Sequence, residues 1–369
     1  MKTICVDARM INFSGIGTYI RNLLPILTKN TTYKYRLLLP EDYQGALETF
    51  PGCDLITCSS GIYSLKEQFE IPRKINKCDL FWSPHYNVPL TSIKADKRVV
   101  TIHDVLHLRY IKNFSFHKRL YASLVMKKAT QYSDAIITVS DFSKSEILAL
   151  THAESSKIKR IYLGIDHDWF CKFNPFSLDR EVRDKFSPPN DFILYVGNVK
   201  PHKNLQGAIS AFKRWIIDKK VDHYFIVIGK HFGDFPLKKN VEKDDVLRNR
   251  VIFYESVGHS DLRWFYTNAI ATVIPSFYEG FGIPAIEAMC AGSPLLASNA
   301  ASLPEVCRDA CVYVDPYSVD SIYDGLQNII LNEANREAIR QKGFENVKRF
   351  NWENAAQKHN ELFDELLSN

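Results

Sequence analysis

Short runs of β-branched and aliphatic residues alternate with longer segments that have the 3.6-residue period of helices. Strands separated by helix-length stretches favour parallel sheets with helical crossovers. The alternation occurs twice, so the sequence predicts an α/β fold of two doubly wound domains. The strand-like runs are residues 3–6, 36–39, 80–82, 99–102 and 135–139 in the first half, and 192–196, 224–228, 251–253, 271–274 and 294–297 in the second.

The boundary between the two halves is predicted from composition. A chain of 369 residues is too long for one typical core and suits two domains of about 150–200 residues. The residues before position 191 are rich in Phe, Pro, Asp and Ser and end in SPPN, a composition typical of linkers. We therefore predict a first domain over residues 1–172, a linker over 173–190, a second domain over 191–350 and a terminal helix over 351–369.

Composition indicates a soluble protein of a reducing compartment. No apolar run approaches the roughly 18 residues of a membrane-spanning helix, and the first residues continue directly into a strand pattern instead of a signal peptide. The 8 cysteines include no CxxC pair, and Cys307 and Cys311 lack a further ligand at metal-binding spacing. We expect reduced cysteines, no bound metal and a cytoplasmic location.

Charge is distributed unevenly along the chain. Through residue 170 there are 23 lysines and arginines against 16 aspartates and glutamates, a net +7, whereas the remainder has 24 against 26, a net −2. This asymmetry indicates that the first half meets an anionic partner. A basic stretch with interleaved leucines fits peripheral contact with an anionic membrane at the inner face of the plasma membrane, and a solvated helix face is the alternative. Its cations are Lys118, Arg119, Lys127 and Lys128, and no signature of nucleic-acid binding accompanies them.

The segment with the most chemical information is residues 275–289, which follows a strand-like run and reads PSFYEGFGIPAIEAM. Pro284 suits the first position of a helix, where a missing N–H costs nothing. The backbone N–H groups just before it would form an anion site at the helix N-terminus. Gly280 and Gly282 permit close approach of a ligand to the backbone. The segment therefore predicts a loop that binds a phosphorylated ligand.

Glu279 and Glu287 lie eight residues apart in this segment, with a carboxylate at each end for ligand hydroxyl groups. The segment resembles the EX7E signature of glycosyltransferase family 4, whose members are retaining enzymes of the GT-B fold. The resemblance implies that Glu279 contacts the donor sugar and that Glu287, in the first turn of the helix, holds the nucleotide ribose. It also implies that the backbone between them contacts sugar and phosphate, at Gly280, Phe281, Gly282 and Ile283.

A second constellation opens the C-terminal half, where residues 193–205 read ILYVGNVKPHKNL. A strand runs into a loop with cations and then into a helix beginning near Asn204. Lys203 provides a compact positive charge suited to a diphosphate leaving group. The loop resembles the family's phosphate-binding loop but has Asn198 and His202 where members often have Arg. Only Lys203 therefore carries over directly, assisted by His202 when that side chain is protonated.

Gly15 and Gly17 form a glycine-rich turn after the first strand and before a helical pattern, an arrangement that favours phosphate. As a dinucleotide fingerprint the turn lacks its third glycine, because Ile20 holds that position. Glu41 and Asp42 after the second strand would still suit a ribose, so NAD binding stays open as an alternative. The segment resembles the opening of mannosyltransferase- and rhamnosyltransferase-like members of family 4, which implies a loop that closes over the donor phosphates.

His103 follows a buried strand-like run and precedes Asp104. We expect it at the carboxyl edge of the first sheet, where doubly wound folds bind ligands. It matches the active-site histidine of the family, which implies a contact with the donor sugar, whereas His107 is expected to play no part. Further donor-binding residues implied by the resemblance are Gly197, Gly229, Lys230 and Val257.

The resemblance spans nearly the whole chain. It implies two Rossmann-like domains facing a central cleft, the first for the acceptor and the second for the donor, with the terminal helix crossing back to the first. It implies transfer of a hexose with retention and without a metal or other cofactor, with His103, Lys203 and Glu279 as catalytic residues. The motifs look most like GDP-mannose-using members, and a saccharide or lipid-linked saccharide of a surface polysaccharide such as O-antigen is the expected acceptor.

Three alternatives stay open at this point. The same transferase would use a UDP- or dTDP-sugar if the nucleotide base is recognised through backbone contacts. A non-catalytic module for nucleotide sugars would keep the phosphate loop and the ribose-binding carboxylate without turnover. An NAD-dependent oxidoreductase would require the glycine that the first turn lacks.

Overall fold

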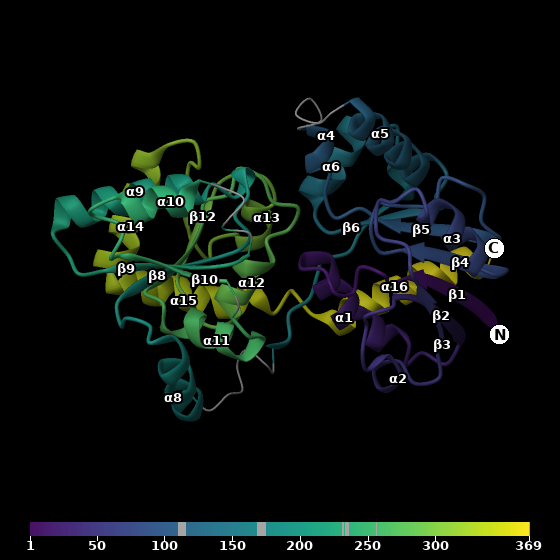
Figure 1. The fold of residues 1–369 in the computed structure, drawn as a ribbon, viewed down its shortest axis with the longest axis horizontal. Coiled ribbons are helices and arrows are strands. Elements are labelled where there is room, and N and C mark those ends of the chain that lie inside the picture. Colours follow the sequence, from purple (N-terminus) through teal and green to yellow (C-terminus); the bar gives the residue numbers. More distant parts are fainter. Residues whose placement is uncertain (110–115, 168–174, 231, 233–235, 256, 369) are drawn as a thin grey trace. The chain divides into compact units, whose positions relative to one another are not determined.

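The computed structural model describes residues 1–109, 116–167, 175–230, 232, 236–255 and 257–368. The chain forms two compact units. Unit 1 consists of Met1–Gly164 and Asn351–Asn369, and unit 2 consists of Ile165–Phe350. Each unit contains a parallel sheet with helices packed on its faces (Figure 1). The predicted class of two doubly wound α/β domains is confirmed.

Unit 1 is built on a seven-stranded sheet in the order β3-β2-β1-β4-β5-β6-β7. The inner strand β1 pairs with β2 on one side and β4 on the other, with Ile4 opposite Tyr35 and Leu80. The strand order reverses between β1 and β4, which is where doubly wound folds bind ligands. The strands are β1 (Lys2–Asp7), β2 (Tyr33–Pro40), β3 (Asp54–Cys58), β4 (Cys78–Ser83), β5 (Ala95–Thr101), β6 (Ala135–Thr138) and β7 (Ile158–Arg160).

The C-terminal helix belongs to unit 1, where it packs along α1 (Figure 1). The ring of Phe363 lies 5.7 Å from that of Trp82 in β4, and the Tyr19 hydroxyl lies 2.7 Å from Nε2 of His359. All four side chains are buried, so the last segment of the chain completes this core. The helices of unit 1 are α1 (Gly15–Leu27), α2 (Ala46–Thr49), α3 (Glu67–Lys74), α4 (Leu106–Arg109), α5 (Phe116–Gln131), α6 (Asp141–Leu150) and α16 (Trp352–Ser368).

Unit 2 has a six-stranded parallel sheet in the order β10-β9-β8-β11-β12-β13. Its order reverses between β8 and β11. The strands are β8 (Phe192–Val196), β9 (Tyr224–Ile228), β10 (Val251–Tyr254), β11 (Ala271–Ile274), β12 (Leu295–Ser298) and β13 (Val312–Val314). The helices are α8 (Pro175–Phe186), α9 (Leu205–Lys219), α10 (Leu237–Lys243), α11 (His259–Asn268), α12 (Ile283–Cys290), α13 (Leu303–Cys307), α14 (Val319–Leu331) and α15 (Glu333–Val347).

The central strands of unit 2 are buried on both faces, as parallel sheets require. Phe225 of β9 packs on Phe212 of α9 with ring centroids 5.3 Å apart, and Trp215 of the same helix is fully buried beside them. Aliphatic side chains from β11, β12 and α14 continue this core. Because the faces of the sheet are covered, polar ligands reach it only at the strand ends.

The segment predicted as a linker, residues 173–190, differs from a linker in the structure. Residues 173 and 174 lie outside the described residues, and most of the rest forms α8. Phe186 of α8 packs edge-on against Phe265 of α11, with centroids 5.6 Å apart, so the helix belongs to unit 2. The chain instead changes unit at Gly164 and Ile165. Composition misled here because an amphipathic surface helix has the same polar content as a linker.

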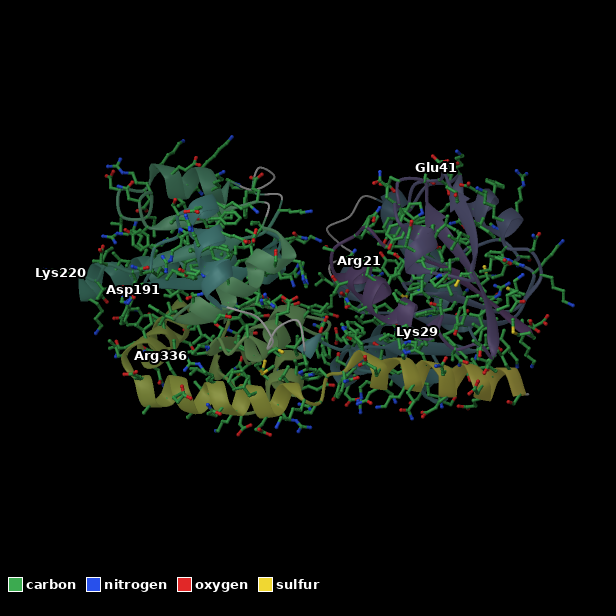
Figure 2. All side chains as sticks on the ribbon, turned by 90° about the horizontal axis from the view of Figure 1, so that it is seen from below. Arg21, Lys29, Glu41, Asp191, Lys220 and Arg336 are labelled. Carbon is green, nitrogen blue, oxygen red and sulfur yellow. The ribbon has the colours of Figure 1, made fainter. Side chains whose placement is uncertain are left out.

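Charged side chains cover the outside of both units. Arg21, Lys29 and Glu41 project from unit 1, and Asp191 and Lys220 from unit 2 (Figure 2). No helix in the described ranges is long and apolar enough to cross a membrane. The cysteines within these ranges are all free, and Cys171 lies outside them.

Candidate functional site

Glu279 lies in the loop between β11 and α12, at the carboxyl edge of the sheet of unit 2. Each of its carboxylate oxygens lies 2.6 Å from the ammonium nitrogen of Lys203, and Ser276 donates a hydrogen bond of 2.8 Å to one of them. The Glu279 side chain is 8% exposed and that of Lys203 is 22% exposed. A short, partly buried ion pair of this kind holds both side chains in one orientation.

Gly282 forms the turn into α12. Its φ of 97° lies in the left-handed region, and a Cβ at this position would come within 2.8 Å of Leu303, so only glycine fits without strain. Pro284 is the second residue of α12 and not the first, because Ile283 begins the helix. Glu287 consequently lies in the second turn of the helix, whereas the sequence predicted it in the first turn.

Glu287 meets a partner that the motif does not contain. Its Oε2 accepts a hydrogen bond of 2.9 Å from the hydroxyl of Tyr266, a fully buried residue of α11. Burial raises the pKa of Glu287 to about 7, although the hydrogen bond from Tyr266 acts in the opposite direction. This carboxyl group therefore exchanges its proton near neutral pH.

The ends of β8 and β9 meet at two glycines. A Cβ at Gly229 would collide with the carbonyl oxygen of Gly197, and the N–H of Gly197 donates 2.9 Å to the carbonyl of Ile228. The carbonyl of Lys230 accepts from the N–H of Val199 at 3.5 Å, and its side chain is exposed. The structure thus brings Gly197, Gly229 and Lys230 to one edge.

The remaining predicted residues of unit 2 lie on the loop after β8 and on the loop after β10. The carbonyl of His202 accepts a 2.8 Å hydrogen bond from the N–H of Phe277, which joins the Lys203 loop to the Glu279 loop. The carbonyl of Asn198 accepts from the Tyr195 hydroxyl at 3.4 Å. Val257 is half-buried just before α11.

Asn204 ties three loops of this site together. It begins α9 with a φ of 52°, and its Oδ1 accepts from the N–H of Gly207 at 3.3 Å. Its amide nitrogen donates to the carbonyl of Pro275 at 3.0 Å and to that of Pro316 at 2.7 Å. Asn tolerates the left-handed conformation better than other non-glycine residues. One side chain therefore fixes the Lys203 loop, the Glu279 loop and the loop after β13.

The other predicted residues belong to unit 1. His103 follows β5, and its Nε2 lies 2.9 Å from the carbonyl of Pro84, so that nitrogen carries the proton. Burial lowers the pKa of His103, so the ring is neutral, and it packs edge-on against Tyr19 with centroids 4.9 Å apart. Gly15 and Gly17 are the first and third residues of α1, inside the helix and not in a turn before it.

A buried ion cluster lies at the same edge of unit 1. The guanidinium of Arg9 donates two hydrogen bonds of 2.8 Å to Asp7 and one of 3.0 Å to Glu67. Asn87 donates 2.9 Å to the other oxygen of Glu67. Burial alone would raise the pKa of Asp7, but Arg9 outweighs it and the pKa lies below its usual range. All three charged side chains are at most 3% exposed, so the charge of Arg9 is neutralised by Asp7 and Glu67 inside the protein.

Two family models match the chain in sequence. The model described as "Glycosyltransferase Family 4" matches residues 13–169, and the one described as "Glycosyl transferases group 1" matches residues 179–346. The chain is a family 4 glycosyltransferase. Its predicted family, fold class and enzyme class are confirmed.

Similar proteins include two mannosyltransferases. O-antigen chain mannosyltransferase B of Escherichia coli is 29% identical over 277 residues, 74% of this chain and 71% of the relative. O-antigen chain mannosyltransferase RfbU of Salmonella typhimurium is 28% identical over 298 residues, 80% of this chain and 76% of the relative. Among solved structures, Anabaena HepE in complex with UDP-glucose has a TM-score of 0.79 at 17% identity and covers 99% of this glycosyltransferase and 100% of its own chain. The similarity to HepE is one of fold, the GT-B fold.

The predicted membrane-facing cations lie on α5. Arg119 and Lys127 are exposed, and the ammonium group of Lys128 lies 4.0 Å from the centre of the Tyr132 ring. The side chain of Lys118 lies outside the described residues. Leu120 and Leu124 on the same helix are 50% and 47% exposed. The helix of this glycosyltransferase therefore presents leucines and cations together.

Metal independence of the glycosyltransferase stays a prediction. Within the described ranges, no three or more His, Cys, Asp or Glu side chains gather in a way that would hold a metal ion.

Sequence reasoning missed the residues that orient the predicted ones. Tyr266 reaches Glu287 from another helix, and Arg9 reaches Glu67 across 58 residues, so no motif contains either pair. Ser276 lies in the predicted loop, three residues before Glu279, but a serine there does not by itself indicate the hydrogen bond. The signal that was available for Asn204 is its type, since Asn before a helical pattern is a common N-cap.

Asn204→Ala is expected to lower the free energy of unfolding by about 2–4 kcal/mol, because it removes an N-cap and leaves two buried carbonyls unpaired. Denaturant unfolding followed by tryptophan fluorescence measures this change. Gln206→Ala, an exposed substitution on the same helix, should change it by less than about 0.5 kcal/mol. Equal stability of the two variants would contradict the role of Asn204.

Proposed function

We propose that this glycosyltransferase moves mannose from GDP-mannose, with retention, to a saccharide or lipid-linked saccharide during assembly of a surface polysaccharide such as O-antigen. The observation that carries the proposal is the Lys203–Glu279 ion pair at the sheet edge of unit 2. The names of the two mannosyltransferase relatives support mannose as the sugar. The complex of HepE with UDP-glucose keeps a UDP-sugar as the second candidate donor.

Departure of a nucleoside diphosphate builds negative charge on the leaving oxygen, so a preorganised cation lowers the barrier. In this proposal Lys203 supplies that cation, together with the backbone N–H groups at the start of α12. Glu279 holds Lys203 in place before the donor arrives and accepts hydroxyl groups of the sugar afterwards. Gly15 and Gly17 at the start of α1 approach the diphosphate, and no metal ion is required.

His103 and Glu287 orient the two ends of the donor in this scheme. Because Nε2 of His103 donates to the carbonyl of Pro84, its neutral Nδ1 is an acceptor for a sugar hydroxyl. Glu287, when ionised, accepts from the ribose hydroxyls. The leaving phosphate oxygen takes the proton of the acceptor hydroxyl on the face where the new bond forms, which gives retention.

The donor is tested by isothermal titration of the purified chain, without added metal, with GDP-mannose, UDP-glucose and a dTDP-sugar. GDP-mannose is expected to bind most tightly. Lys203→Ala should weaken its binding about ten- to 150-fold, because a charge-assisted contact is worth about 1.5–3 kcal/mol.

Lys200→Ala, an exposed lysine in the same loop, serves as the matched control and should bind GDP-mannose as the wild type does. Tighter binding of UDP-glucose would replace the donor and keep the site. Normal binding and normal donor turnover by Lys203→Ala would remove this lysine from the mechanism.

Affinity for GDP-mannose should rise about tenfold from pH 6 to pH 8, because the ribose hydroxyls need the ionised Glu287 and its pKa is about 7. The diphosphate of this donor is doubly esterified and does not titrate in that range. The free energy of unfolding of the ligand-free protein depends on pH in the opposite direction. The raised pKa of Glu287 favours the protonated folded form, so stability falls as pH rises from about 4.5 through 7.

Titration of Glu287→Gln across the same pH range checks the assignment. This variant should bind weakly and with a flat pH profile. A profile like that of the wild type would assign the titration to another group.

We further propose that α5 contacts an anionic membrane surface at the inner face of the plasma membrane, supported by its exposed leucines and cations. The chain should float with vesicles of phosphatidylcholine and phosphatidylglycerol and not with phosphatidylcholine alone. The double substitution Arg119→Gln and Lys127→Gln should weaken vesicle binding about thirtyfold, because each cation contributes about 1 kcal/mol. Glutamines at the exposed Lys219 and Lys220 of unit 2 should leave it unchanged, and equal effects of the two pairs would contradict a specific contact.

A further inference from the structure

Buried polar atoms without a hydrogen-bond partner gather at the carboxyl edge of the sheet of unit 1. Within the described part of the chain, four such atoms lie at or after the ends of β3, β4 and β5. They are Oγ of Ser60, Oγ of Ser83, Nε2 of His85 and Nε2 of His107. Buried polar groups in folded proteins are nearly always paired. A concentration of unpaired ones at a ligand-binding edge therefore points to a polar molecule from outside the chain.

The protonation of His85 shows what such a molecule must offer. Its Nδ1 accepts a hydrogen bond of 3.1 Å from the N–H of Asn87. Burial lowers the pKa of His85 to about 4, so the ring is neutral and its single proton lies on the unpaired Nε2. The side chain is fully buried. Nε2 of His85 is therefore a hydrogen-bond donor without an acceptor in the protein.

Three aromatic rings, one of them that of His107, come together after the ends of the same strands. The rings of Tyr86 and His107 are stacked, with centroids 4.4 Å apart and planes 15° from parallel. The ring of Tyr63 lies 6.1 Å from that of Tyr86 and is 46% exposed, whereas the other two are half-buried. The C–H face of a pyranose packs on such rings, while its hydroxyl groups meet their polar tips. The combination suits a sugar.

The backbone of Tyr63 has a strained conformation. Its φ of 65° lies in the left-handed region, which is unusual for a bulky residue. Backbone conformations of this kind persist where the surroundings impose them, and they are common at ligand-binding sites. The strain places the Tyr63 ring next to Tyr86, where it extends the stacked surface.

The charges at this edge favour hydroxyl groups over phosphate. Arg9 is 3% exposed and is already bound by Asp7 and Glu67. Burial lowers the pKa of His107, so this ring is neutral as well. Burial is the main cause that raises the pKa of Tyr86, and the carboxylate of Asp104 adds to it as a nearby negative charge. Neutral rings and a carboxylate bind hydroxyls and repel anions.

We infer that Tyr63, Tyr86, Asp104 and His107 form the surface that binds the terminal sugar of the acceptor. The inference rests on the proposed function, which requires a saccharide acceptor, and adds the residues that recognise it. The outer faces of the aromatic rings supply the stacking surface, and the half-buried carboxylate of Asp104 takes sugar hydroxyls. His107, which the sequence marked as having no part, becomes a specificity-determining residue.

The test measures saturation transfer by NMR from the purified full chain to methyl glycosides of α-mannose, α-rhamnose, α-galactose and β-N-acetylglucosamine. At least one glycoside should receive saturation at its ring C–H protons. His107→Ala and Tyr86→Ala should weaken its binding at least tenfold, and Tyr86→Phe, which keeps the ring, should retain most of it. GDP-mannose affinity, measured by titration, should stay unchanged in all three variants.

His152→Ala and Tyr132→Ala, both at exposed positions of unit 1, are the matched controls and should bind glycosides normally. Should Tyr86→Ala fail to fold, as judged by its thermal midpoint, His107→Ala carries the test. Absence of glycoside binding by the wild type, or unchanged binding by folded His107→Ala, would overturn the inference. Glycoside binding by a chain that binds no nucleotide sugar would instead overturn the proposed function and leave this surface standing.

Discussion

A parallel sheet has to be covered on both faces, and the position of the candidate site residues in this protein follows from that requirement. The strands of both sheets are apolar in their interiors, and helices bury them from either side. Chemistry is therefore confined to the loops at the strand ends. In unit 2 these are the loops after β8 and β11, and in unit 1 those after β1, β4 and β5. The strand order reverses between β1 and β4 and between β8 and β11. In doubly wound folds the connections from two such strands run to opposite faces of the sheet, which opens a crevice at the strand ends.

Two ion pairs at these edges differ in what they leave accessible. Arg9 is enclosed by two carboxylates and is almost fully buried, so its charge serves the fold of unit 1. Lys203 meets a single carboxylate and keeps 22% of its side chain exposed. An incoming diphosphate can compete for Lys203 at modest cost, whereas drawing Arg9 out would strand two buried carboxylates. Accessibility, more than charge itself, separates the cation suited to catalysis from the structural one.

The sequence predicts the interiors of the sheets well and their edges poorly. Residues 192–196, 224–228 and 271–274 were predicted as strands and have those bounds, because each is a continuous apolar run. The strands that were not predicted are β3, β7 and β13, and all three are edge strands. An edge strand is covered less completely, so it needs fewer apolar residues and leaves a weaker pattern. The helix α8 was missed for a related reason, since its charged outer face resembles a linker.

The same distinction explains what could be predicted of the site. A motif contains the residues that one loop carries, so Glu279, Glu287 and Lys203 were visible in the sequence, but their pairing was not. Lys203 and Glu279 are 76 residues apart, and Tyr266 reaches Glu287 from another helix. These contacts arise only when neighbouring strands of the sheet bring their ends together. The fold thus turns two isolated carboxylates into different groups. Glu279 is ion-paired and holds the cation suited to a charged leaving group, whereas Glu287 titrates near pH 7 and, when ionised, suits neutral hydroxyls.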